Sequence, residues 1–160
     1  GENKKMKEPD YRITALAEEP KWIEIAATWF HKKWNIAEQT YRQSMEQSRA
    51  YPEGIPQWYI ALDCREQILG GLGVIENDFH KRKDLRPNIC AVYVEEGWRG
   101  QGLARALLAH ACAALAKMGE REVFLLTDHI GFYEACGWEF WCMAEEEAGG
   151  NARVYRKTLK

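Results

Sequence analysis

The sequence predicts a single α+β domain built on a mixed, mostly antiparallel central sheet flanked by helices. The chain has 160 residues, a length that suits one domain with a substantial core. Strand and helix patterns follow one another in the order β-α-α-β-β-β-α-β-α-β-β, without internal repeats. The domain is expected to occupy residues 11–160, after a polar and flexible N-terminal segment of residues 1–10.

The first half of the chain is expected to form a strand, two helices and a hairpin. These elements cover Tyr11–Leu16, Trp22–Trp34, Ile36–Arg49, and Trp58–Leu62 with Gln67–Glu76. Asn35 is placed to cap the second helix. Three glycines, Gly70, Gly71 and Gly73, interrupt the last strand and predict a β-bulge or a close approach of another group to the backbone.

The second half is expected to contain the centre of the sheet. The segments are a buried strand Ile89–Val94, a helix Leu103–Met118, a strand Val123–Thr127, a short helix around Phe132 and Tyr133, and closing strands Glu139–Ala144 and Ala152–Thr158. The loop 77–88 carries the basic run 80–83, which either binds an anionic group or is simply solvated. The acidic run 145–147 either attracts a cationic amine or is likewise solvated.

Composition excludes several classes of partner. The formal net charge of −2 gives no reason to expect nucleic acid. No apolar run is long enough to span a bilayer. The five cysteines are odd in number and contain no CxxC pair, which favours reduced thiols over disulfides or a zinc site. We therefore expect a cytoplasmic protein with no metal, no membrane association and no nucleic-acid partner.

The strongest functional signal is a glycine turn between a strand and a helix. Gly100 and Gly102 flank Gln101, so the backbone amides of the turn can approach a ligand without interference from Cβ atoms. The helix that begins at Leu103 points its positive end at the same place. Free amides at a helix N-terminus predict a phosphate or pyrophosphate site.

Two common phosphate loops do not fit this turn. A P-loop requires Lys followed by Ser or Thr after its last glycine, where this chain has Leu103 and Ala104. A dinucleotide-binding fingerprint requires a third glycine, where this chain has Arg105.

Two segments resemble the signatures of the GCN5-related N-acetyltransferases. Arg99-Gly100-Gln101-Gly102-Leu103-Ala104 resembles the acyl-CoA loop of that family, Arg/Gln-x-x-Gly-x-Gly/Ala. Phe132-Tyr133-Glu134-Ala135-Cys136-Gly137-Trp138 resembles its Phe-Tyr-x-x-x-Gly-Phe/Trp segment. The interval between them matches one helix and one strand, so the resemblance covers nearly the whole chain and implies acetyl-CoA as co-substrate.

The resemblance implies where acetyl-CoA binds. A bulge in the strand Ile89–Val94 is expected to separate it from the next strand, and backbone groups of Val92, Tyr93 and Val94 to hold the pantetheine and thioester. The pyrophosphate is expected on the loop Arg99–Gly100 and on the amides of Gln101, Gly102, Leu103, Ala104 and Arg105.

The implied reaction is attack of a primary amine, on a small molecule or a peptide, at the thioester carbonyl. Tyr133 matches the family's tyrosine that faces the sulfur and is the candidate proton donor to the thiolate. Glu76 is the first candidate for the general base, followed by Asp128 and His129. A non-catalytic acyl-CoA sensor, another acyl group and an oxygen acceptor remain alternatives, and the chain is expected to be a monomer or homodimer.

Overall fold

The computed structural model describes residues 10–160, so all but the last residue of the predicted N-terminal segment lies outside the described part. The elements are β1 (Tyr11–Ala15), η1 (Pro20–Trp22), α1 (Ile23–Trp34), α2 (Glu38–Ala50), β2 (Gln57–Asp63), β3 (Ile68–Ile75), β4 (Asn88–Val94), η2 (Glu96–Trp98), α3 (Leu103–Lys117), β5 (Glu122–Thr127), α4 (Phe132–Ala135), β6 (Glu139–Glu145) and β7 (Asn151–Thr158). The order and type of the elements agree with the sequence pattern.

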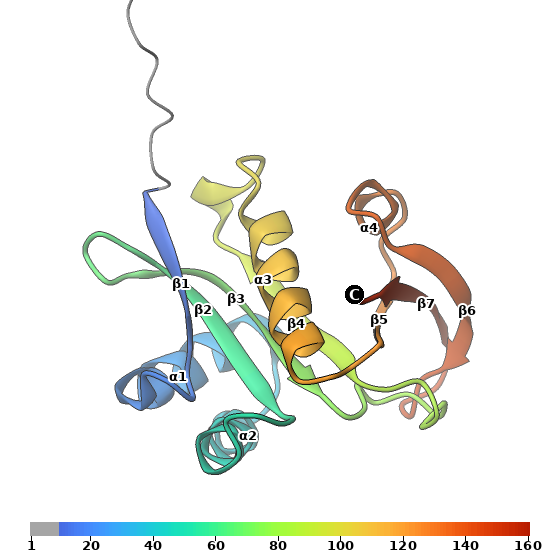
Figure 1. Ribbon diagram of the computed structural model, residues 1–160, viewed down its shortest axis with the longest axis horizontal. Helices are drawn as coiled ribbons and strands as arrows, with labels where there is room; N and C mark the ends of the chain where they lie inside the picture. Colours follow the sequence, from blue (N-terminus) through green and yellow to red (C-terminus); the bar gives the residue numbers. More distant parts are fainter. Residues whose placement is uncertain (1–9) are drawn as a thin grey trace, which may run out of the picture.

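The strands form one sheet in the order β1-β2-β3-β4-β5-β7-β6 (Figure 1). Every neighbouring pair is antiparallel except β4 and β5, which are parallel. The predicted mixed, mostly antiparallel sheet is therefore confirmed. The apolar strand β4 takes the central position, where side chains on both faces are buried.

Helices cover both faces of the sheet, and the alternation of β2 side chains shows which helix covers which face. Tyr59 and Ala61 pack with α3, whereas Trp58, Ile60 and Leu62 pack with α1 and α2. In Figure 1, α3 crosses one face near β4, and α1 and α2 lie away from it beneath β1 and β2. The result is two hydrophobic cores separated by the sheet.

A bulge opens the centre of the sheet. Ala91 has a φ of 55°, and the register between β3 and β4 shifts at the same level, between Gly71 and Gly73. Only Asn88 and Ile89 of β4 pair with β5. The rest of β4, including the bulge, therefore has no partner on that side. The two strands therefore separate toward the end of β4, as the resemblance implied.

The glycines of β3 let aromatic side chains approach its backbone closely, which is one of the two roles that the sequence predicted for them. A Cβ at Gly73 would lie 2.5 Å from the Trp58 ring, and one at Gly71 would lie 2.8 Å from Phe30 Cζ. Both distances are shorter than real carbon contacts, so the aromatic core of α1 and β2 rests directly on the β3 backbone.

One predicted cap is wrong. Asn35 does not start the second helix; it ends α1 in the left-handed conformation, with φ 50°. The residue before α2 is Ala37, which makes no side-chain cap. Asparagine adopts this conformation more readily than most residues, so it terminates a helix here instead of starting one.

Two kinds of feature are absent from residues 10–160. No helix in this part of the chain combines the length and apolar character needed to cross a bilayer. In the same residues, no three His, Cys, Asp or Glu side chains gather as metal ligands would.

Candidate acyltransfer site

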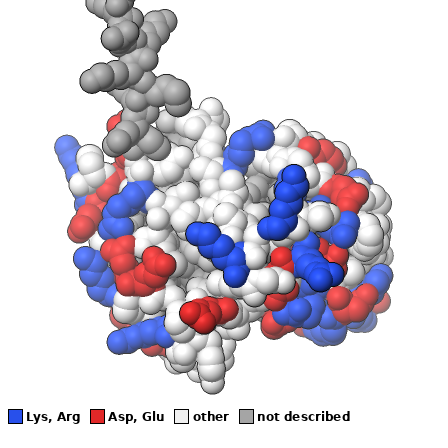
Figure 2. Space-filling model, viewed as in Figure 1, with Lys and Arg blue, Asp and Glu red and all other residues white. Residues whose placement is uncertain are grey.

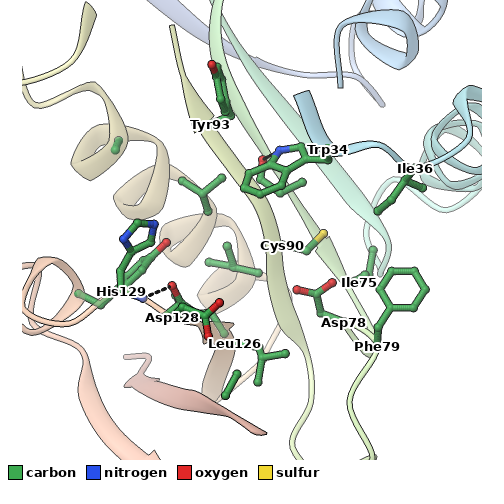
Figure 3. A pocket seen from close by; sticks show the side chains of 18 of the residues that line it. Trp34, Ile36, Ile75, Asp78, Phe79, Cys90, Tyr93, Leu126, Asp128 and His129 are labelled. Carbon is green, nitrogen blue, oxygen red and sulfur yellow. Dashed lines mark hydrogen bonds between the residues drawn. The ribbon is translucent and has the colours of Figure 1, made fainter. Parts of the chain in front are cut away.

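A cavity of about 790 Å³ opens where β4 and β5 separate (Figure 3). One part of its lining comes from the end of β4, the start of α3, the end of β5 and α4. These residues are Val92, Tyr93, Val94, Arg99, Ala104, Leu125, Leu126, Thr127, Asp128, His129, Phe132 and Tyr133. The other part comes from α1, α2, β2, the β3–β4 loop and the β6–β7 hairpin, and includes Trp34, Ile36, Tyr41, Ser44, Trp58, Asp78, Phe79 and Glu146. The predicted cofactor strand and Tyr133 thus share one cavity.

The glycine turn has the backbone that a phosphate site needs. Gly100 and Gly102 have φ of 76° and 82°, and a Cβ at either position would meet nothing within 4 Å. The first bond within α3 runs from the Ala106 N–H to the Gly102 carbonyl, so the amides before Ala106 have no acceptor inside the helix. The residues present therefore fit a pyrophosphate group.

The free edge of β4 lies beside this turn. Past Ile89, β4 has no ladder partner on the side of β5. Trp34 Nε1 donates to the Ala91 carbonyl at 3.2 Å, and Arg99 Nε donates to the Val94 carbonyl at 3.0 Å. The Arg99 guanidinium also lies 5.3 Å from the centre of the Tyr93 ring. These contacts fix the strand end while leaving an edge that can accept an extended amide-containing chain.

Tyr133 is held rigidly against the cavity. Its ring packs against Phe132, Trp138 and Tyr155, with centroids 5.0, 6.2 and 5.9 Å away. Glu134 fixes the start of α4 by accepting from the Gly131 N–H at 2.7 Å. Burial raises the pKa of Tyr133 to about 12, so its hydroxyl is protonated at neutral pH.

The structure separates the three candidate bases. Asp128 and His129 line the cavity near Tyr133, at the end of β5. Glu76 does not line it; its carboxylate accepts from Arg86 Nε at 2.5 Å, and this hydrogen bond lowers the pKa of Glu76. An exposed carboxylate held by an arginine is a poor proton acceptor, so Glu76 loses its place as first candidate.

Sequence reasoning missed Asp78 and Tyr41 as site residues, and it placed Glu146 in an acidic run that either attracts a cationic amine or is solvated. Figure 3 shows Asp78 on one side of β4 and Asp128 on the other, around the same cavity. Burial, and then the neighbouring Glu146 carboxylate, raise the pKa of Asp78 to about 6. The three residues come from α2, the β3–β4 loop and the β6–β7 hairpin, so no local motif could have joined them.

Two lysines of the basic run 80–83 form ion pairs with the acidic run 145–147. Lys81 Nζ lies 2.8 Å from Glu145 Oε1, and Lys83 Nζ lies 2.7 Å from Glu147 Oε1. These pairs join the β3–β4 loop to the β6–β7 hairpin. The basic run 80–83 and the acidic run 145–147, whose partners the sequence did not specify, thus pair with each other.

His80 is the buried anchor of this loop. Its Nδ1 accepts from the Arg82 N–H at 3.2 Å, which leaves Nε2 as the donor to Asn88 Oδ1 at 2.8 Å. Asn88 Nδ2 in turn donates to the carbonyls of Glu76 and Leu85. The satisfied network fixes the backbone on both sides of Asp78.

The comparisons agree with this arrangement. The sequence model described as the acetyltransferase (GNAT) family matches residues 20–138. No curated protein matches the chain.

Solved structures share the fold at low sequence identity. An aminoglycoside 6'-N-acetyltransferase complexed with coenzyme A has a TM-score of 0.70 and 14% identity, with 93% of this chain and 97% of that chain covered. Mutant forms of the spermidine/spermine N-acetyltransferase from Vibrio cholerae have a TM-score of 0.66, 14% identity and coverages of 93% and 94%. An acetyltransferase of the GNAT family from Staphylococcus aureus Mu50 has a TM-score of 0.59, 15% identity and coverages of 94% and 99%.

Proposed function

Because the chain belongs to the acetyltransferase (GNAT) family, we propose that it transfers an acetyl group from acetyl-CoA to a primary amine of a small molecule or peptide. The observation that carries the proposal is the cavity that joins the free edge of β4 to Tyr133, close to the glycine turn. Two structural neighbours are named for acetylation of aminoglycosides and of spermidine or spermine, which supports a small amine as acceptor.

Different groups along and after β4 bind different parts of acetyl-CoA. The amides from Gln101 to Arg105 hold the pyrophosphate, and the edge from Val92 to Val94 binds the pantetheine arm. Acetyl-CoA supplies an activated acyl group whose C–S bond breaks as the new C–N bond forms. The Val94 N–H is our proposed donor to the thioester oxygen, where negative charge develops.

Two protons must move. The attacking nitrogen loses one, and Asp128 or His129, which line the cavity beside Tyr133, takes it. The leaving sulfur gains the other from the Tyr133 hydroxyl, whose raised pKa keeps it protonated at neutral pH. Tyr133 then regains a proton from solvent, and the base releases the proton that it took, before the next turnover. The products are the amide and coenzyme A with its free thiol.

The test measures release of free thiol from acetyl-CoA over a panel of amino acids, diamines, polyamines, aminoglycosides and peptides. Release with at least one amine, and formation of the corresponding N-acetyl product by mass spectrometry, is expected. Coenzyme A binding without release from any amine would instead favour a non-catalytic acyl-CoA sensor. Propionyl-CoA and alcohol acceptors in the same panel test the other acyl groups and oxygen acceptors.

A further inference from the structure

The part of the cavity remote from Tyr133 contains a polar cluster that the proposed reaction does not use. We call Asp78, Glu146 and Tyr41 the distal subsite; all three line the cavity. Asp78 lies in the loop that enters β4 at Asn88, whereas the glycine turn follows the other end of β4. Along β4 the order is therefore distal subsite, bulge, thioester edge and pyrophosphate turn.

Tyr41 is a buried donor and acceptor without a partner. Its side chain is only 3% exposed, and its hydroxyl makes no hydrogen bond to any described residue. The ring is fixed by stacking on Phe30, with centroids 5.5 Å apart, and by an edge contact with Trp58. A buried polar atom of this kind destabilises the fold unless a ligand or water satisfies it.

The backbone holds the two carboxylates of the subsite close together. His80 and Glu146 form an isolated antiparallel bridge, and the Glu147 N–H donates to the Phe79 carbonyl at 2.8 Å. Phe79 has a φ of 59°, a strained conformation for an aromatic residue that this contact and the buried His80 maintain. Asp78, the residue before Phe79, lines the cavity together with Glu146.

The surroundings of the subsite suit a cation. Trp34 and Phe79 line the cavity and are 41% and 52% exposed, so part of each aromatic side chain is open to a ligand. Among residues 10–160, Arg99 is the only arginine or lysine in the lining; it lies at the cofactor end, against the Tyr93 ring. The distal part thus combines two carboxylates, a hydroxyl and aromatic faces, which together attract an ammonium group.

We propose, resting on the function proposed above, that the distal subsite binds a second cationic nitrogen of the acceptor, so that the enzyme prefers diamines. A primary ammonium has three N–H donors, and Asp78, Glu146 and Tyr41 supply three oxygen acceptors. The carbon chain between the two nitrogens lies against Trp34 and Phe79 while the other amine reaches the thioester. An acceptor that carries a carboxylate at the distal end is rejected by like charge.

The test compares α,ω-diamines of three to six carbons with n-alkylamines of the same length, by kcat/KM for thiol release. The wild-type enzyme is expected to favour the best diamine by about 10-fold or more, since one charged contact is worth at least ~1.4 kcal/mol. 1,5-Diaminopentane is expected to exceed lysine, whose carboxylate would face the subsite.

Variants assign the preference to residues. In Asp78→Asn and Glu146→Gln the ratio of diamine to monoamine falls about 10-fold through KM, and the pH profile of kcat stays in place. Glu145→Gln is the matched control, because Glu145 lies in the same hairpin, pairs with Lys81 and does not line the cavity. Equal rates for diamines and monoamines would overturn the proposal. So would loss of kcat with every amine in Asp78→Asn, which would put Asp78 at the reacting nitrogen.

Calorimetry keeps the subsite testable if no amine is acetylated. Titration of 1,5-diaminopentane into the protein with coenzyme A is expected to show binding that Asp78→Asn weakens about 10-fold. Diamine binding without turnover would refute the proposed reaction and support the subsite. Turnover of monoamines without diamine binding would support the reaction and refute the subsite.

Discussion

At the scale of single residues, the neighbours of ionisable groups in and near the cavity shift their pKa values in opposite directions. Tyr133 is buried among aromatic rings, and this raises its pKa. Asp78 is half-buried beside another carboxylate, which raises its pKa as well. Glu76, only two residues earlier, faces Arg86 in solvent and has a lowered pKa. Position in the fold, and not residue type, thus decides which carboxylate can exchange a proton near neutral pH.

Tyr133→Phe is expected to lower kcat by about 10- to 1000-fold with little change in affinity for acetyl-CoA, because it removes only the hydroxyl that we propose as the proton donor. Thiol-release kinetics, together with calorimetric titration of coenzyme A, measure both quantities. Tyr59→Phe is the control: Tyr59 is also buried, its pKa is also raised to about 12, and it lies outside the cavity lining. Unchanged turnover in Tyr133→Phe would remove this hydroxyl from the mechanism.

Asp78→Asn is expected to stabilise the fold at neutral pH. Asp78 has a pKa of about 6 in the folded protein and about 4 when unfolded, so the folded state binds more protons between these values. The contribution of Asp78 to the free energy of unfolding therefore falls as pH rises from about 4 to about 6. Above about pH 6 the buried, ionised carboxylate continues to destabilise the fold. Asparagine avoids that cost, on the order of 1–3 kcal/mol, or a few degrees in Tm.

Thermal unfolding of Asp78→Asn and wild type between pH 4 and pH 8 tests whether the substitution stabilises the fold at the higher pH. The gain of the variant should be present at pH 8 and vanish near pH 4. Asp84→Asn serves as the control, because Arg82 lowers the pKa of Asp84 and its removal should give no gain at pH 8. A variant that is less stable than wild type at pH 8 would contradict a raised pKa at Asp78.

At the scale of elements, α3 and its turn show what local sequence can specify. Helix α3 starts after two residues with positive φ and ends before a third, Gly119, with φ 91°. Glycine is required at all three for the same backbone reason. The turn was therefore visible from sequence, because a left-handed backbone leaves a direct mark on residue choice.

Matched glycine substitutions separate backbone strain from ligand binding. Gly102→Ala and Gly119→Ala are each expected to lose about 1–2 kcal/mol of stability, since both force alanine into positive φ with no clash. Only Gly102→Ala should also raise the KM for acetyl-CoA, by about 10-fold or more, because its new methyl group lies on the turn that we propose holds the phosphates. Equal KM values in both variants would show that the pyrophosphate does not bind at this turn.

Other elements show where prediction from sequence stops. The strands and long helices followed from hydrophobic periodicity, which depends only on which face is buried. The bulge was expected from the resemblance, but its left-handed residue is Ala91, which carries no sign of that conformation in the sequence. Phe79 is a second case. The distal subsite depends on pairing between loop 77–88 and a hairpin some 65 residues later, a tertiary contact with no local signature.

At the scale of the whole molecule, the sheet consists of two parts with a narrow junction. Strands β1 to β4 form one part and β5, β7 and β6 the other, and only two residue pairs join β4 to β5. The ion pairs between loop 77–88 and the hairpin reinforce the junction on one side. Charges elsewhere are mixed, with acidic and basic side chains interspersed around a largely uncharged centre on the face that carries α3 (Figure 2).

A ligand that adds to the free edge of β4 should therefore stabilise the molecule at this junction. Coenzyme A at about 100 times its Kd is expected to add about 2.7 kcal/mol, or roughly 5–10 °C in Tm. Hydrogen exchange of the amides of Val92–Val94 and of the first turn of α3 should slow more than exchange in α2. Gly102→Ala at the same ligand concentration should show a smaller shift and weaker protection. A thermal shift with protection confined to the β6–β7 hairpin would instead show that coenzyme A binds outside the opening between β4 and β5.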